Sequence, residues 1–207
     1  MVGFAGYHMP IQYEGIMAEH LWTRAHAGLF DVSHMGQVAI KGVGAQDFLQ
    51  SLTPSSFEKL PINKAKYTVL VNPDGGIIDD LMVTSTGDHL LVVINAACKD
   101  ADLAHMQKHL SATCEVEPMF SRGLLALQGP QASAVLSRLA PQVATMKFMT
   151  GAYVVIDGAR CYVTRSGYTG EDGYEISAAA DRIGEIWDTL LLDGNVKPIG
   201  LGARDSL

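Results

Sequence analysis

The most constraining feature of this sequence is a pattern that occurs twice. Residues 38–52 and 125–139 each begin with a short apolar run that ends at a glycine, Gly42 or Gly129. In both copies Ala and Leu then recur at a spacing that makes one apolar helical stripe. The copies lie 87 residues apart, from Val38 to Leu125, which is far too long for a solenoid repeat. The pattern therefore predicts an α+β fold of two related halves, approximately residues 36–112 and 122–193.

The segments after each copy predict the rest of each half. A hairpin with a glycine-containing turn follows, then another strand, residues 90–94 or 174–177, and a second helix, residues 99–110 or 182–192. Each half is thus strand, helix, hairpin, strand, helix, and we expect the two pseudo-repeated halves to pack together. Such halves tend to leave a cleft where they meet, and small-ligand sites favour such interfaces.

Composition narrows the class of protein. The net charge is −7 without any run of Lys or Arg, so the basic surface expected of a nucleic-acid binder is absent. No apolar run approaches the length of a membrane span, and residues 1–7 lack the pattern of a signal peptide. Three widely spaced cysteines fit reduced thiols better than disulfides or a zinc site. We expect a small ligand or another protein as the partner, with neither nucleic acid nor membrane.

Two adjacent acids stand in an unusual place. Asn72 to Gly76 supplies the Pro, Asp and Gly of a turn between strands 67–71 and 77–84, and Asp79 and Asp80 lie in the second strand. Because successive side chains on a strand face opposite ways, we expect the two carboxylates to have separate environments. Neither face is polar, so at least one acid must lie among apolar groups, where it needs a partner or a ligand.

Five ordered motifs carry a family resemblance that covers the whole chain. They are Leu-Phe-Asp-Val-Ser-His-Met (29–35), Gly-Gly-Ile-Ile-Asp-Asp-Leu (75–81), Leu-Gln-Gly-Pro (127–130), Gly-Tyr-Thr-Gly-Glu-Asp-Gly-Tyr-Glu-Ile (167–176) and Gly-Leu-Gly-Ala-Arg-Asp-Ser-Leu (200–207). Together they resemble the glycine cleavage system T protein family of folate-dependent aminomethyltransferases. Family members continue into a β-rich C-terminal domain, so the resemblance implies that residues 1–207 are a folate-binding region without that domain. A helix beginning at Ala203 would then have one turn, which we expect to fray unless something holds it.

The resemblance implies a reaction. An aminomethyl group on the lipoyl arm of a partner H protein is transferred to tetrahydrofolate, giving 5,10-methylenetetrahydrofolate and ammonia. Tetrahydrofolate is a co-substrate, and no metal is required. The resemblance places such a protein in the bacterial cytoplasm or the mitochondrial matrix.

The resemblance also implies roles for single residues. Asp80 resembles the family aspartate beside folate N10, where a carboxylate can orient the amine and stabilise a developing cation. Glu175 resembles the pterin-binding acid, and Arg204 resembles an arginine near the folate. Four residues resemble the remaining pocket wall: Met35, Tyr67, Asn95 and Tyr168.

The same residues can also be explained without any functional role. Asp80 could be a solvated edge-strand acid, Glu175 could simply be exposed, and Arg204 could pair with Asp205. Asp79 is expected to serve a hydrogen bond near the turn or a salt bridge. No histidine pair lies at i, i+4 on one helical face, which argues against a metal site.

Three alternatives to the aminomethyltransferase also remain. The chain could be the folate-binding module of a demethylase or oxidase, or a folate-binding protein without transferase activity. As a fragment it could also bind nothing tightly, and we expect the 207-residue chain to be inactive or severely impaired alone.

Overall fold

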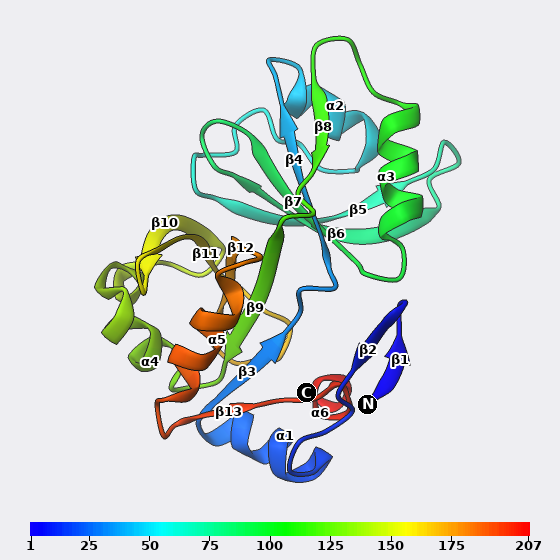
Figure 1. The fold of residues 1–207 in the computed structure, drawn as a ribbon. Coiled ribbons are helices and arrows are strands. Elements are labelled where there is room, and N and C mark those ends of the chain that lie inside the picture. The colour runs from blue at the N-terminus through cyan, green and yellow to red at the C-terminus, as the bar shows by residue number, and fades with distance from the viewer. The chain divides into compact units, whose positions relative to one another are not determined.

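The computed structural model describes all residues from Met1 to Leu207, and their contacts divide the chain into two compact units (Figure 1). The central unit is residues 35–120. The terminal unit combines residues 1–34 with residues 121–207.

The central unit is a five-stranded antiparallel sheet with two helices. Its elements are β4 (Gly36–Lys41), α2 (Ala45–Leu52), β5 (Ala65–Val71), β6 (Ile77–Ser85), β7 (Leu90–Ile94), α3 (Lys99–Lys108) and β8 (Glu115–Pro118). The strand order is β5-β6-β7-β4-β8. Phe48 and Leu49 of α2 and Met106 of α3 join one buried cluster with sheet residues such as Leu81 and Val83. The two helices therefore cover the sheet face that carries Leu81 and Val83.

The terminal unit is built around a six-stranded sheet. Its elements are β1 (Val2–Phe4), β2 (Tyr7–Met9), α1 (Ile16–Ala25), β3 (Ala27–Asp31), β9 (Arg122–Gln128), α4 (Ala132–Leu139), a 3-10 helix (Pro141–Thr145), β10 (Thr150–Ile156), β11 (Ala159–Arg165), β12 (Gly173–Ala179), α5 (Ile183–Leu191), β13 (Val196–Pro198) and α6 (Leu201–Ser206). The strand order is β10-β11-β12-β9-β3-β13, and only β13 and β3 are parallel. Helices α4 and α5 contribute Leu136 and Ile186 to its core.

The predicted pseudo-repeat is confirmed. Each half is strand, helix, hairpin, strand and helix, and the four repeated strands have the same order: β5-β6-β7-β4 in one sheet and β10-β11-β12-β9 in the other. Each sheet is also extended at the same edge, by β8 beside β4 and by β3 beside β9. Residues 1–34 belong with the second half, which the repeat pattern did not indicate.

The predicted hairpin of β5 and β6 is present and contains an irregularity. Asn72 Oδ1 accepts hydrogen bonds from the N–H groups of Asp74 (3.0 Å) and Gly76 (2.8 Å), and Gly75 has a φ of 80°, which favours glycine. Leu70 pairs with Asp79 but Val71 pairs with Ile77, so Ile78 is an extra residue in β6.

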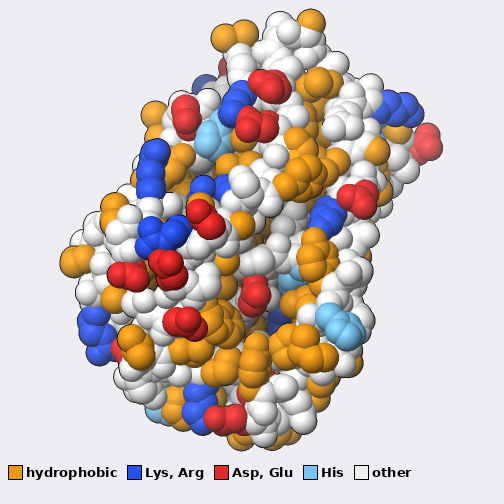
Figure 2. Space-filling view, in the orientation of Figure 1, with side chains coloured by type: hydrophobic (Ala, Val, Ile, Leu, Met, Phe, Trp, Pro, Cys, Tyr) orange, Lys and Arg blue, Asp and Glu red, His pale blue; other side chains and the backbone are white.

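Neither the charged side chains of the surface nor the helices show a feature beyond those expected from the sequence. On the face drawn in Figure 2, acidic and basic side chains lie interspersed, without a field of one sign. No helix is both long and apolar enough to cross a membrane.

Candidate functional site

Asp80 lies in the central unit, half-buried on β6, with two hydrogen-bonding neighbours. The side-chain Nδ2 of Asn95, directly after β7, donates to Asp80 Oδ1 at 2.8 Å and to the Asp80 carbonyl oxygen at 3.2 Å. Tyr67 of β5 also hydrogen-bonds to the Asp80 carboxylate through its side chain, and its pKa is raised by burial and by the charge of Asp80. The predicted residues Asp80, Asn95 and Tyr67 are therefore brought together.

Met35 lies at the same end of the central sheet. Gly36 pairs with Ile94, so Met35 precedes the last pair on β4 just as Asn95 follows it on β7. Met35 is partly buried, and Tyr67 is more exposed, with 50% of its surface accessible to solvent. The four predicted residues of this unit thus come from four neighbouring strands, β5, β6, β7 and β4, or from their ends.

Asp79 does not behave as expected. It shares the helix-covered face with Leu81 and Val83, but Asn95 Nδ2 also donates to its Oδ1 at 3.1 Å. One amide therefore links Asp79 and Asp80, and the expectation of separate environments is wrong because a residue at a strand end can reach both faces. Asp79 forms no salt bridge and no turn-side hydrogen bond; no N–H or O–H group donates to its buried Oδ2, and the Cys98 thiol and Asp102 are its remaining neighbours.

A third acid, which the sequence analysis missed, lies against this pair. Asp102 of α3 is 0% exposed, and neither of its oxygens has a conventional hydrogen-bond partner. Burial, a side-chain hydrogen bond to Asp79, and the charges of Asp79 and Asp80 raise the pKa of Asp102 to about 7. The signal was present in the sequence, because Asp102 stands four residues before the core residue Met106 on one helical stripe.

In the terminal unit, Glu175 is the half-buried acid of β12. Ser166 Oγ donates to its Oε2 at 2.7 Å, and Ser166 Oγ and Thr164 Oγ1 lie 2.8 Å apart. Thr164 is the cross-strand partner of Glu175 on β11. Burial raises the pKa of Glu175, opposed by hydrogen bonds from Ser166 and Thr164 and by the charge of Arg204.

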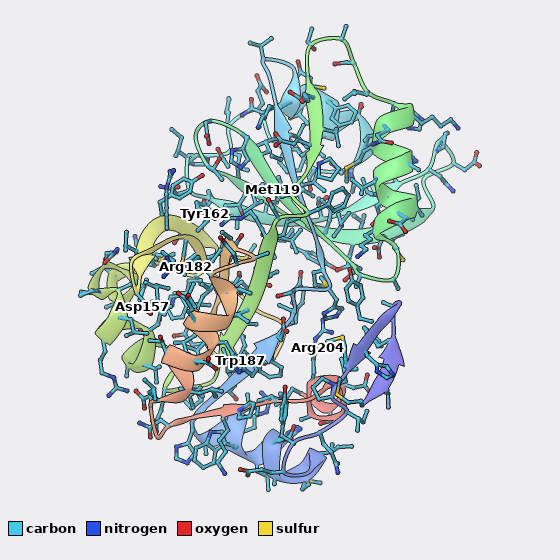
Figure 3. All side chains as sticks on the ribbon, in the orientation of Figure 1. Met119, Asp157, Tyr162, Arg182, Trp187 and Arg204 are labelled. Carbon is cyan, nitrogen blue, oxygen red and sulfur yellow. The ribbon has the colours of Figure 1, made fainter.

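Arg204 lies on α6 (Figure 3) and acts electrostatically on Glu175. Burial lowers the pKa of its guanidinium, and the negative charge of Glu175 opposes that shift. Arg204 is in none of the ion pairs of the chain, so the alternative pairing with Asp205 is not formed. Glu175 and Arg204 are thus near one another, and no ion pair uses the donors of the arginine. Tyr168 lies between β11 and β12 and is 61% exposed.

Helix α6 is fixed by a buried carboxylate that the sequence analysis also missed. Glu19 of α1 is 1% exposed; its Oε1 accepts the N–H groups of residues 13, 14 and 15, and its Oε2 accepts Gly200 N–H at 2.7 Å. Burial alone would raise the pKa of Glu19, but these four N–H groups lower it. The helix begins at Leu201, not Ala203 as expected, because Gly200 is already held here and Leu201 N–H bonds to the carbonyl of Pro10.

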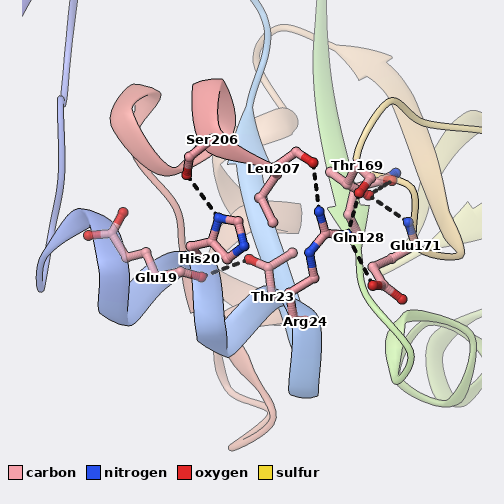
Figure 4. Close-up of polar contacts among 9 residues, drawn as sticks. All are labelled: Glu19, His20, Thr23, Arg24, Gln128, Thr169, Glu171, Ser206 and Leu207. Carbon is pink, nitrogen blue, oxygen red and sulfur yellow. Dashed lines mark hydrogen bonds and ion pairs between the residues drawn. The ribbon is translucent and has the colours of Figure 1, made fainter.

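The last residues have further partners (Figure 4). Arg24 of α1 donates to the carbonyl oxygens of Leu207 at 2.6 Å and Thr169 at 2.5 Å, and pairs with Glu171 at 3.0 Å. His20 hydrogen-bonds to Ser206 at 2.9 Å. Helix α1 thus joins α6 to the loop that carries Tyr168. No group of three His, Cys, Asp or Glu residues in the structure is arranged to hold a metal ion.

Comparisons with known proteins agree along the whole chain. Residues 1–207 match the family described as the GCVT N-terminal domain. A probable mitochondrial aminomethyltransferase of Schizosaccharomyces pombe is 44% identical over 214 residues, which cover 100% of this chain and 55% of that protein. An aminomethyltransferase of Synechococcus sp. RCC307 is 45% identical, with 100% and 58% covered.

A solved structure gives the same result. The crystal structure of glycine cleavage system aminomethyltransferase T from Bartonella henselae has a TM-score of 0.92 and 42% identity, covering 100% of this chain and 57% of that one. The present chain thus spans somewhat more than half the length of the relatives it matches. Because the match covers every residue and the fold agrees, the chain belongs to the GCVT N-terminal domain family.

Proposed function

We propose that this chain is the folate-binding part of an aminomethyltransferase of glycine cleavage. The reaction moves the one-carbon unit from the aminomethyl-lipoyl arm of H protein to tetrahydrofolate, giving 5,10-methylenetetrahydrofolate and ammonia and leaving the lipoyl arm of H protein as the free dithiol. The names of the relatives support the transferase class. The observation that carries the proposal is the Asp80 carboxylate, held by Asn95 and Tyr67 without any basic partner.

Asp80 has the chemistry that the transfer needs. Asn95 and Tyr67 fix the orientation of its carboxylate, and no Lys or Arg neutralises its charge. A carboxylate held this way can accept the proton of the folate N10 amine and stabilise positive charge that develops on the transferred carbon. Tyr67 and Asn95 are positioning residues in this scheme.

Glu175 and Arg204 fit the remaining polar groups of the co-substrate. A pterin edge presents N–H donors and acceptors together, and the Glu175 carboxylate, to which Ser166 donates at Oε2, is a group that can accept such N–H bonds. Arg204 supplies donors that no ion pair consumes. Met35 and Tyr168 would add apolar and aromatic surface, and aromatic rings pack well against a pterin or benzoyl ring.

The proposed partner is the lipoyl-bearing H protein. The relatives include both bacterial proteins and proteins named mitochondrial, so we propose the bacterial cytoplasm or the mitochondrial matrix as the compartment.

The test is turnover of aminomethylated H protein and tetrahydrofolate by the full-length protein. We expect Asp80→Asn to lower kcat by on the order of 10²–10⁴, because the amide can neither accept the proton nor stabilise the cation. Asp47→Asn on the exposed surface of α2 makes the same chemical change and should leave kcat unaltered. Wild-type turnover by Asp80→Asn would overturn the role of Asp80, and folate binding without any transfer would overturn the transferase.

A further inference from the structure

Three carboxylate oxygens behind Asp80 have no conventional partner. They are Oδ2 of Asp79 and both oxygens of Asp102, and all are buried. Two ionised carboxylates have no proton between them to donate, so they cannot hydrogen-bond to each other. Because Asp79 lies close enough to raise the pKa of Asp102, these buried oxygens can satisfy one another only if one of the two acids carries a proton.

The surroundings of Asp102 favour the protonated form. From β6 it faces Asp79 and Asp80, and at the start of α3 lies the Cys98 thiol, whose pKa is raised by burial and by Asp79. The other titratable side chains are Lys99, Asp100, His105 and Lys108 on α3 itself, and Glu115 and Glu117 on β8, which packs against α3. No ion pair reaches Asp79, Asp80 or Asp102. When three acids lie together without a cation, ionising all of them has a high free-energy cost, so one of them tends to keep its proton.

Asn95 connects this buried pair to Asp80. Its Nδ2 carries two hydrogens and lies within hydrogen-bonding distance of three oxygens, one on Asp79 and two on Asp80. If the Asp79–Asp102 pair lost its proton, Asp79 would become a stronger acceptor and would compete with Asp80 for that amide. The position of the Asp80 carboxylate therefore depends on the charge of the buried pair.

We propose that Asp79 and Asp102 share one proton, and that this proton keeps Asp80 the sole fully charged carboxylate and leaves Asn95 to orient it. Asp79 and Asp102 are positioning residues, and this role rests on the proposed function of Asp80. The shared proton itself is a property of the chain alone. It leaves as pH rises, because a carboxyl with a raised pKa is protonated below that value and ionised above it.

The first experiment measures the proton without any substrate. Side-chain carboxyl NMR of the 207-residue chain should show a carboxyl that titrates near neutral pH in the wild type and is lost in Asp102→Asn. Asp100→Asn, an exposed acid on the same helix, should leave it in place. If no aspartate titrates above about pH 5.5, a value already well beyond ordinary aspartates, the shared proton does not exist.

The second experiment measures the consequence in the full-length enzyme. Asn at position 102 offers Asp79 a permanent N–H donor, so Asp102→Asn should keep kcat at alkaline pH, with the alkaline limb moved upward by about one pH unit or more. Asp102→Ala offers no donor and should lower kcat across the profile. Identical profiles for wild type and Asp102→Asn would overturn the positioning role. Absence of turnover in the wild type would instead overturn the proposed function and leave the NMR result standing.

The terminal unit also contains a hollow of about 410 Å³, and three of the residues that line it are arginines. Arg122, at the start of β9, donates to Ser177 Oγ at 2.8 Å and Ser177 O at 2.7 Å and pairs with no carboxylate. The Arg160 guanidinium lies 4.2 Å from the Tyr153 ring centre and forms no ion pair. A guanidinium that stacks through its face keeps its N–H edges free to donate.

The third arginine is only partly neutralised. Arg182 pairs with Glu185 through Nε at 2.7 Å and donates from Nη2 to the Asp157 carbonyl, which leaves Nη1 unused (Figure 3). None of the residues lining the hollow is acidic, although the whole chain has a net charge of −7. From this geometry we infer that the hollow binds an oxyanion, either a phosphate or a carboxylate group, between Arg122, Arg160 and Arg182.

The probes are inorganic phosphate and acetate, each at constant ionic strength, with detection by Arg side-chain NMR. One of them should give saturable shifts at Arg122 that Arg160→Gln weakens at least about tenfold, and the tighter probe identifies the anion class. Arg138→Gln, on the exposed side of α4, is the matched control and should bind as the wild type does. Shifts that do not saturate, or that chloride reproduces, would show that no oxyanion site exists.

Discussion

Glu19 in the terminal unit and Asp102 in the central unit are buried equally but behave in opposite ways. Their exposed fractions are 1% and 0%. The pKa of Glu19 is lowered, because four backbone N–H groups outweigh the effect of burial. The pKa of Asp102 is raised to about 7, because burial is reinforced by two acidic neighbours. Burial alone therefore does not decide the charge of a carboxyl; its hydrogen-bond donors do.

The difference matters for both candidate sites. Glu19 remains charged and fixes Gly200, directly before the helix that carries Arg204. Asp102, with its raised pKa, lies behind Asp80 through Asp79 and Asn95. One unit thus stabilises its site with a permanent charge, and on our proposal the other does so with a shared proton that can leave.

The largest expected effect is on the terminal unit. Glu19→Gln turns an acceptor oxygen into an NH₂ donor that faces backbone donors, and should lower the free energy of unfolding by ~2–4 kcal/mol at pH 7. Urea denaturation followed by tryptophan fluorescence measures it, because Trp22 and Trp187 both lie in this unit. The exposed control Glu185→Gln should change the value by less than ~0.5 kcal/mol. Equal stability changes in Glu19→Gln and Glu185→Gln would mean that the buried position of Glu19 does not contribute to stability.

The same carboxylate-to-amide change should have the opposite sign in the central unit. Because the raised pKa of Asp102 costs stability as pH rises from about 4 to about 7, Asp102→Asn should raise the free energy of unfolding at pH 8 by ~1–3 kcal/mol. At pH 5 the gain should be much smaller. Hydrogen exchange of the β6 and β7 amides measures it, with Asp100→Asn as control. A loss of stability at pH 8 would refute the comparison.

Much of the fold follows from the sequence pattern. The repeat predicted both sets of strands and helices, and the Asn-Pro-Asp-Gly-Gly turn predicted the hairpin of β5 and β6. The placement of residues 1–34 could not be predicted, because β3 joins β9 and the parallel strand β13 through pairings with residues more than 90 positions away. The extra residue Ile78 in β6 also has no signature in the sequence.

The residues that the motifs point to are brought together, whereas the two buried acids were not predicted. Asp80, Tyr67 and Asn95 come together, as do Glu175 and Arg204. Asp102 could have been found from its place on the Met106 stripe. Glu19 could not have been found in this way. The helical stripe that carries it on α1 also contains Thr23, so the sequence predicts a solvent-exposed face there. Only its four N–H donors, from two distant segments, explain why it is buried.

Acid should remove the difference between Glu19 and glutamine. A carboxylate whose pKa is lowered in the folded state contributes stability above its ordinary pKa of 4.5, and that contribution is lost as pH falls through the lowered value. The stability difference between wild type and Glu19→Gln should therefore shrink by ~1–2 kcal/mol between pH 6 and pH 3. Tryptophan fluorescence in urea at each pH measures it. A difference that is constant with pH would mean that Glu19 acts through shape and not through charge.

The smallest expected effect concerns Glu175, which has intermediate support: two hydroxyl groups and the charge of Arg204. Ser166→Ala removes the 2.7 Å hydrogen bond that favours the ionised form, so the pKa of Glu175 should rise further, with a stability change of ~1 kcal/mol or less at neutral pH. Side-chain carboxyl NMR measures the pKa, and Ser137→Ala on α4 is the control. An unchanged pKa would show that Thr164 and Arg204 suffice. A rise would show that the Ser166 hydroxyl opposes the effect of burial at Glu175, as the backbone N–H groups do at Glu19.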